Sequence, residues 1–170
     1  GGIYTATYPP RIAHLRVIDN GTEIKQVYLK GHTWFVLTYL LGGGLLLIAG
    51  DWALELIGSQ TILLARPLLL VALIASILEN NHSTAGAILL TKNEVPFFKA
   101  SILFGFLTVA LLFVFFKCFN LGIWAMILAP GIAQVVYQNW KWPYEVAKEL
   151  KINAKDYLTS LRFFQIRKRI

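Results

Sequence analysis

Four long apolar runs, three of them without charged residues, alternate with short polar stretches along this chain. The runs cover residues 31–50, 61–90, 100–116 and 118–140. A helix needs about 20 residues to cross the ~30 Å hydrocarbon core of a bilayer, so three of these runs fit one crossing directly. The run over 61–90 contains Arg66 and Glu79 and would be ~45 Å long as a single helix, so we expect it to tilt, break or extend beyond the membrane. The pattern predicts an all-α polytopic transmembrane bundle of four spans.

Composition and charge agree with a membrane protein. Hydrophobic residues make up 56% of the chain, yet the formal net charge is +7. Except for Arg66 and Lys117, the lysines and arginines lie before the first run, between the second and third, or after the fourth. The positive-inside rule places these stretches, and therefore both ends of this chain, in the cytoplasm. We expect membrane lipid as a partner and no nucleic acid.

Three regions follow from this pattern. Residues 1–30 are expected to be the end of a preceding helix, stopped by Pro9 and Pro10, and a cytoplasmic link with a turn at Asp19-Asn20-Gly21. Residues 31–143 hold the four spans. Residues 144–170 form a basic tail in which Tyr157, Leu161 and Phe164 recur at helical spacing, with Asn153 and Asp156 placed to begin the helix. The tail is predicted to be amphipathic and to lie on the inner leaflet, with a solvated basic tail as the alternative.

Small and aromatic residues refine the bundle. Ala125, Ala129 and Ala133 recur at helical spacing in the fourth run, where small residues permit close helix packing, and Pro130 predicts a kink. Trp140 and Trp142 are expected near a membrane interface.

Some kinds of chemistry are excluded. The single cysteine, Cys118, rules out an internal disulfide and a cysteine-rich metal site, and we interpret it as a small apolar packing residue. The chain has no phosphate-binding loop of the GxxxxGK type, and its connections are too short for a catalytic domain. We expect no cofactor, no metal and no enzymatic activity. Because the chain begins Gly-Gly and its only methionine is Met126, we interpret it as a piece of a longer or processed product.

The second run carries the candidate chemistry. Ser76, Glu79 and Ser83 recur every three or four residues, so one helix face is polar for about three turns. A charge at the bilayer centre costs ~2.5–3.5 kcal/mol on insertion scales, so this face should point into the bundle or a wet cavity. The candidate substrate-cavity or coupling residues are Glu79, Arg66, His82, Asn80, Asn81, Ser76 and Ser83.

Each candidate also has a structural interpretation. Glu79 and Arg66 serve either in transport or in interhelical bonding, while for His82, Asn80 and Asn81 we favour bonding between helices. Arg66 and Glu79 are about 220° apart around an ideal helix, so they cannot share one narrow cavity unless the helix bends. We favour Glu79 for the cavity and expect Arg66 to extend toward the outer interface.

Two segments resemble a known family. LENNHSTAGAILLTKNEVPFFKASILFG (residues 78–105) and ILAPGIAQVVYQNWKWP (residues 127–143) are similar to the carboxy-terminal region of bacterial polysaccharide-biosynthesis membrane proteins of the O-antigen flippase (Wzx-type) group. That group belongs to the multidrug/oligosaccharidyl-lipid/polysaccharide exporter superfamily. Asn-Trp-Lys-Trp-Pro is the more specific element. The resemblance implies a two-lobed exporter, of which this chain supplies the end of helix eight and helices nine to twelve.

The resemblance also implies a function. The parent protein would flip undecaprenyl-diphosphate-linked oligosaccharide repeat units across the bacterial inner membrane, for O-antigen or capsular polysaccharide synthesis. Its partners would be that lipid-linked substrate and the missing amino-terminal lobe. Two alternatives remain. One is a membrane enzyme of the same pathway, an O-antigen polymerase or a polyprenyl-linked glycosyltransferase, with Glu79, His82 and Arg66 around a lipid diphosphate. The other is a drug or ion antiporter of the same superfamily, since fold does not determine substrate.

Overall fold

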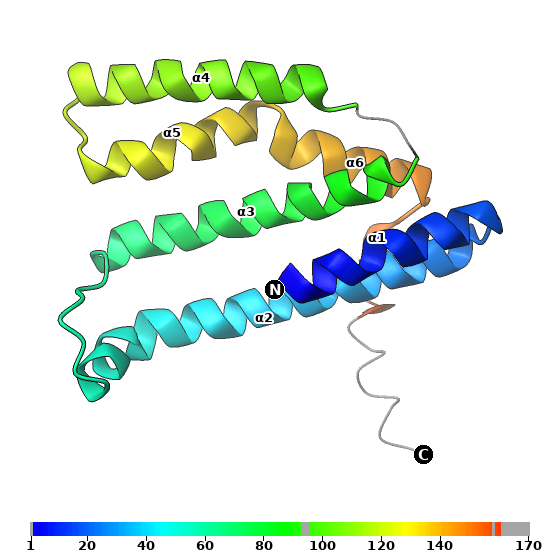
Figure 1. The fold of residues 1–170 in the computed structure, drawn as a ribbon, viewed down its shortest axis with the longest axis horizontal. Helices are drawn as coiled ribbons and strands as arrows, with labels where there is room; N and C mark the ends of the chain where they lie inside the picture. Colours follow the sequence, from blue (N-terminus) through cyan, green and yellow to red (C-terminus); the bar gives the residue numbers. More distant parts are fainter. Residues whose placement is uncertain (1, 93–95, 158, 161–170) are drawn as a thin grey trace.

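The protein is a stack of helices. The computed structural model describes residues 2–92, 96–157 and 159–160, and within them the chain is helical and forms no strand. The helices are α1 (Gly2–Val17), α2 (Gly21–Leu56), α3 (Arg66–Leu90), α4 (Phe98–Lys117), α5 (Ile123–Val136) and α6 (Gln138–Glu149). Figure 1 shows the long helices stacked in the order α4, α5, α3 and α2, with α1 alongside α2 and α6 alongside α3. The predicted all-α class is confirmed.

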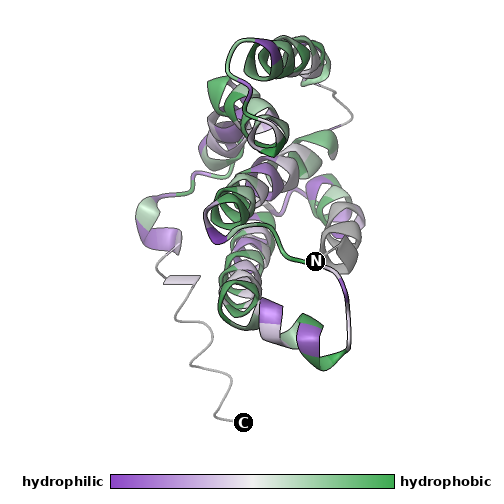
Figure 2. Cartoon of the chain, turned by 90° about the vertical axis from the view of Figure 1, so that its left-hand side faces the viewer, coloured by the Kyte–Doolittle hydropathy of each residue, from purple (hydrophilic) through white to green (hydrophobic). Residues whose placement is uncertain are grey.

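Three of the described helices, α2, α3 and α4, are long and apolar enough to cross a membrane. Figure 2 looks roughly along the helix axes, and the green, hydrophobic positions extend around much of the long helices. At 36 residues, α2 is ~54 Å long, so it extends well past a ~30 Å hydrocarbon core. The expected span over 61–90 begins later, at Arg66, because Pro67 suits the first turn of a helix. Arg66 is therefore the first residue of α3 rather than a residue inside a span.

The fourth apolar run is not one helix, contrary to expectation. After a loop that ends at Gly122, where φ is +55°, α5 has only 14 residues and is ~21 Å long. It continues through Pro130 and stops before Tyr137, so the break is not at the expected kink. The break lets α6 turn toward α3, against which it packs.

A cluster of buried apolar side chains lies where α2 begins and α3 ends, and we call it the basal core. It joins residues of α1, α2, α3 and α6: Ile12, Leu15, Ile24, Val27, Tyr28, Ala85, Ile88, Leu89, Trp142 and Val146, with Leu150 just beyond α6. Trp142 was expected at an interface but is only 5% exposed. Its ring packs edge-on against Phe97, with centroids 5.6 Å apart, so this tryptophan helps to bring the start of α4 to the basal core.

The spanning helices are much less buried by one another. None of the residues of α4 is buried, although this helix packs along α5. In α5 the buried side chains include Ala125, Ala129 and Ala133, the residues predicted to allow close packing. Cys118, expected to pack, is exposed at the end of α4.

The amino-terminal region differs from the expected link. The backbone of α1 continues through Pro9 and Pro10, as helices can where other groups satisfy the freed carbonyls. The predicted turn is confirmed: Asp19 has a φ of 52°, and the Asn20 side chain accepts a hydrogen bond from the Glu23 backbone N–H. Residues 2–30 are thus an antiparallel helical hairpin, and its second helix continues into the first span.

The described part of the basic tail lies against α2. Pro143 is inside α6 rather than at its end, and a helical turn begins after Asn153, as expected. Lys25 of α2 pairs with Asp156 at 2.7 Å, and the hydroxyls of Thr33 and Ser160 are 2.8 Å apart. The predicted stripe residues Leu161 and Phe164 lie outside the described residues.

The up-and-down path of the chain separates its charges. The start of α2, the end of α3, the start of α4 and α6 share one end of the stack, whereas the loops over 57–65 and 118–122 share the other (Figure 1). The basic links therefore meet at one end, which we call the basic end. Arg66 and Lys117 lie at the opposite end.

This separation predicts an orientation that can be tested in the full-length protein. In a Cys118→Ser background, cysteines replace Gln60 and Ala154, which are exposed at opposite ends of the stack. A membrane-impermeant thiol reagent added to intact cells should label position 60 only, because the basic end is expected in the cytoplasm. Permeabilised cells should show labelling at both positions. Labelling of position 154 in intact cells would contradict the orientation.

Candidate functional site

On one side of the polar face of α3, Asn80 contacts α2. The side-chain amide of Asn80 donates to the Tyr39 hydroxyl at 3.0 Å and to the Ser76 carbonyl at 2.8 Å. The Thr84 hydroxyl in turn donates to the Asn80 carbonyl at 2.7 Å. All these bonds are partly buried. Asn80 therefore joins α3 to α2, and Ser76 takes part through its backbone.

On the other side of this face, His82 contacts α6. Its Nδ1 lies 2.8 Å from Oδ1 of Asn139. Asn139 is the first residue of the Asn-Trp-Lys-Trp-Pro element. This bond links that element to the polar face, in agreement with the structural interpretation of His82.

Between these two contacts, the middle of the polar face is open. Glu79 and Ser83 are exposed. Asn81 is half-buried and lies off this face, about 200° from Glu79 around an ideal helix. No ion pair formed within the described residues includes Glu79. Arg66 is also exposed, but it lies ~20 Å from Glu79 along the helix axis. Helix α3 thus carries a carboxylate near its middle that the described part of the chain does not cover.

A groove runs beside this face between α3 and α5. Its volume is about 210 Å³. Most of its lining is apolar, including Ala75, Leu78 and Val135, and the polar residues Gln134 and Asn139 line it as well. Since Asn139 also bonds His82, the groove adjoins the α3–α6 contact.

A second polar cluster lies at the basic end, and the sequence did not predict it. The Arg16 guanidinium pairs with Glu149 at 2.6 Å and donates to the Thr91 hydroxyl at 2.6 Å. Lys92 pairs with the other oxygen of Glu149 at 2.7 Å. The side chains of Arg16 and Glu149 are each 20% exposed. These bonds connect α1, the end of α3 and α6, and the partners are too distant in sequence for any local pattern to reveal them.

Two further ion pairs, Lys25–Asp156 and Lys141–Glu145, are partly exposed at this end. A hydrogen bond from the Asn153 backbone N–H is the main cause that holds the pKa of Asp156 below its usual range. A hydrogen bond from Lys25 lowers this pKa further. Within α6, the hydrogen bond from Lys141 lowers the pKa of Glu145. Both carboxylates are therefore ionised at neutral pH, and both pairs remain charged.

The described residues contain no group of three or more His, Cys, Asp or Glu side chains that could hold a metal ion. Comparison with protein-family models, with curated proteins and with solved structures finds no match to this chain.

Two arginines of α1 allow a matched test of the Arg16 cluster. Arg16→Gln should lower the free energy of unfolding by about 1.5–3 kcal/mol, because it removes charged hydrogen bonds from a half-buried carboxylate. Arg11→Gln breaks a similar pair with Glu23, but Arg11 is 61% exposed, so its cost should be below about 1 kcal/mol. Unfolding of the purified full-length protein in detergent, followed by tryptophan fluorescence, measures both. Equal effects of the two substitutions would contradict a special role for the Arg16 cluster.

Proposed function

We propose that this chain is the carboxy-terminal part of an exporter that flips undecaprenyl-diphosphate-linked oligosaccharide repeat units across the bacterial inner membrane. The observation that carries the proposal is the exposed Glu79 near the middle of α3. A charged side chain at that depth is costly in contact with lipid, so it belongs against a water-filled cavity or another part of the protein. Both are features of a transporter with a second lobe.

The family resemblance supports the same proposal. The two similar segments, residues 78–105 and 127–143, are brought together in space, since α3 packs against α6 and α4 packs against α5. His82 of the first segment bonds Asn139 of the second, and Phe97 packs on Trp142. The described residues of these two segments thus pack together, and Glu79 is one of them. In this packing the Asn-Trp-Lys-Trp-Pro element acts mainly to hold helices together.

The short loops opposite the basic end also favour transport over catalysis. The loops opposite the basic end cover only residues 57–65 and 118–122, which leaves no room there for a catalytic domain. A flippase needs no such domain, because it moves its substrate without breaking covalent bonds.

The proposed mechanism divides the roles of the two ends. The basal core and the Arg16 cluster hold α1, α3 and α6 together at the basic end. Glu79 lies near the middle of α3, away from the basic end, and would face the cavity shared with the other lobe. Its carboxylate would bind a proton or pair with a cation as the cavity opens to one side or the other. The sugar diphosphate would be bound by cationic groups of the complete cavity.

Substitution of Glu79 tests this proposal. Glu79→Gln preserves shape and hydrogen bonding but removes the charge, so it should lower surface polysaccharide about tenfold or more, the factor that corresponds to ~1.4 kcal/mol of lost interaction. Ser83→Ala alters the same exposed face without changing charge and should have little effect. Surface polysaccharide is measured at matched protein abundance in cells that carry each variant of the full-length gene. Full activity of Glu79→Gln would make Glu79 a structural residue only.

Deletion of the parent gene separates the proposed function from its alternatives. Loss of a flippase should abolish surface polysaccharide while complete lipid-linked repeat units accumulate on the cytoplasmic side. Exported single units without long chains would indicate a polymerase, and incomplete repeat units a glycosyltransferase. Normal polysaccharide would point to the drug or ion antiporter instead.

A further inference from the structure

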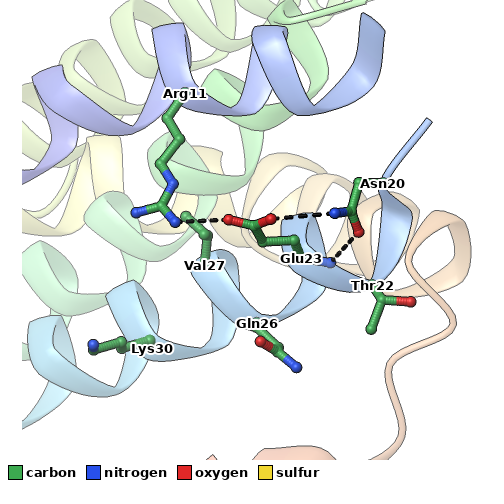
Figure 3. A pocket seen from close by; sticks show the side chains of 7 residues that line it. All are labelled: Arg11, Asn20, Thr22, Glu23, Gln26, Val27 and Lys30. Atoms are coloured by element: carbon green, nitrogen blue, oxygen red, sulfur yellow. Dashed lines mark hydrogen bonds and ion pairs between the residues drawn. The ribbon is translucent and has the colours of Figure 1, made fainter. Parts of the chain in front are cut away.

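A polar cleft separates α1 from α2 at the basic end. Its volume is about 420 Å³. Figure 3 shows Arg11 extending from α1 toward Glu23 of α2, with Gln26 and Lys30 farther along α2. Thr22 and Asn20 line the end near the α1–α2 turn, and Val27 forms the apolar part of the wall. None of these residues belongs to the polar face of α3 or to the Arg16 cluster.

Glu23 is the only carboxylate among the described lining residues, and both of its oxygens already accept hydrogen bonds. One oxygen of Glu23 accepts from Arg11 at 2.7 Å, and the other accepts from the Asn20 side chain at 3.2 Å. The remaining N–H groups of Arg11 and the ammonium group of Lys30 are donors with positive charge. Of the charged lining residues, two are cationic and one is anionic. The free hydrogen-bonding capacity of the cleft therefore suits an anion with several acceptor oxygens.

The depth of the cleft relative to the membrane indicates which kind of anion binds there. Lys30 directly precedes the charge-free part of α2, residues 31–50, so it lies at the depth where the hydrocarbon core gives way to headgroups. The other basic residue of this part of α2, Lys25, is used elsewhere, by Asp156 and the Lys151 carbonyl. Lys30 is exposed and free to contact a group outside the chain. Basic clefts between helices at the cytoplasmic surface are suited to lipid phosphates.

We infer that the α1–α2 cleft binds the phosphate of an anionic phospholipid headgroup, of the phosphatidylglycerol type, in the cytoplasmic leaflet. Lys30 and the outer N–H groups of Arg11 bind the phosphate oxygens, and Gln26 and Thr22 are placed to bond the polar headgroup. The acyl chains extend along the apolar surface of α2. This site is independent of the transport proposed above, since it uses no residue of the polar face of α3.

Native mass spectrometry of the purified full-length protein in detergent tests the site. The protein is titrated with phosphatidylglycerol or with phosphatidylcholine, and both lipids carry the same acyl chains. The wild type should retain phosphatidylglycerol preferentially. Lys30→Gln should weaken its binding about fivefold, the factor that corresponds to ~1 kcal/mol for one basic residue near a lipid surface. Lys99→Gln is the matched control: Lys99 is exposed in the first turn of α4 at the same end of the stack. It should leave binding unchanged.

The other outcomes overturn the inference. Equal losses in Lys30→Gln and Lys99→Gln would show diffuse attraction between anionic lipid and the basic end. Unchanged binding in Lys30→Gln would exclude this cleft, provided that thermal unfolding in lipid-free detergent shows the variant to be folded. If inorganic phosphate displaces phosphatidylglycerol from the wild type at equal concentration, the cleft is a site for soluble phosphate rather than for lipid.

Discussion

The packing of α6 against the end of α3 holds this molecule together, because it is where apolar side chains are removed from water. Val146 and Ile12 are fully buried there, and Trp142 nearly so. Burial of one such side chain stabilises a protein by about 1.5–3 kcal/mol, but only where the alternative is water. Within lipid the surroundings are as apolar as the side chains, and that gain disappears. The basal core thus contains the largest fully buried side chains, Ile12 and Val146, while α4 has no buried residue at all.

The spanning region must depend on other contacts. Small residues allow α5 to approach its neighbours, as the buried Ala125 and Ala129 show. Polar bonds provide a few specific links, from Asn80 to Tyr39 and from His82 to Asn139. These links lie on both sides of Glu79 and leave it open. The structure thus combines a buried core at the basic end with spanning helices that bury little of one another.

Charge has two different roles at the basic end. Some basic side chains are used in internal pairs, as in the Arg16 and Lys92 bonds to Glu149. Others, such as Lys30 and Lys99, are exposed around the stack. The first group ties helices to one another, whereas the second group makes no such link within the described residues, and of its members Lys30 lines the α1–α2 cleft. The positive-inside rule counts every basic residue, whether or not it is paired within the protein. Only the tertiary structure separates the two groups.

The amino-acid sequence by itself determined the helical class, the positions of α2, α3 and α4, and the polar face that contains Glu79. These features are local: a helix satisfies its own backbone within one segment, and its periodicity is visible in consecutive residues. The tertiary structure alone decided the break at Tyr137, the burial of Trp142 and the pairing of Arg16 with Glu149. Each of these depends on segments that are distant in the chain, such as α3 and α6 or, 133 residues apart, Arg16 and Glu149. Such segments meet where the apolar surfaces of the basal core exclude water.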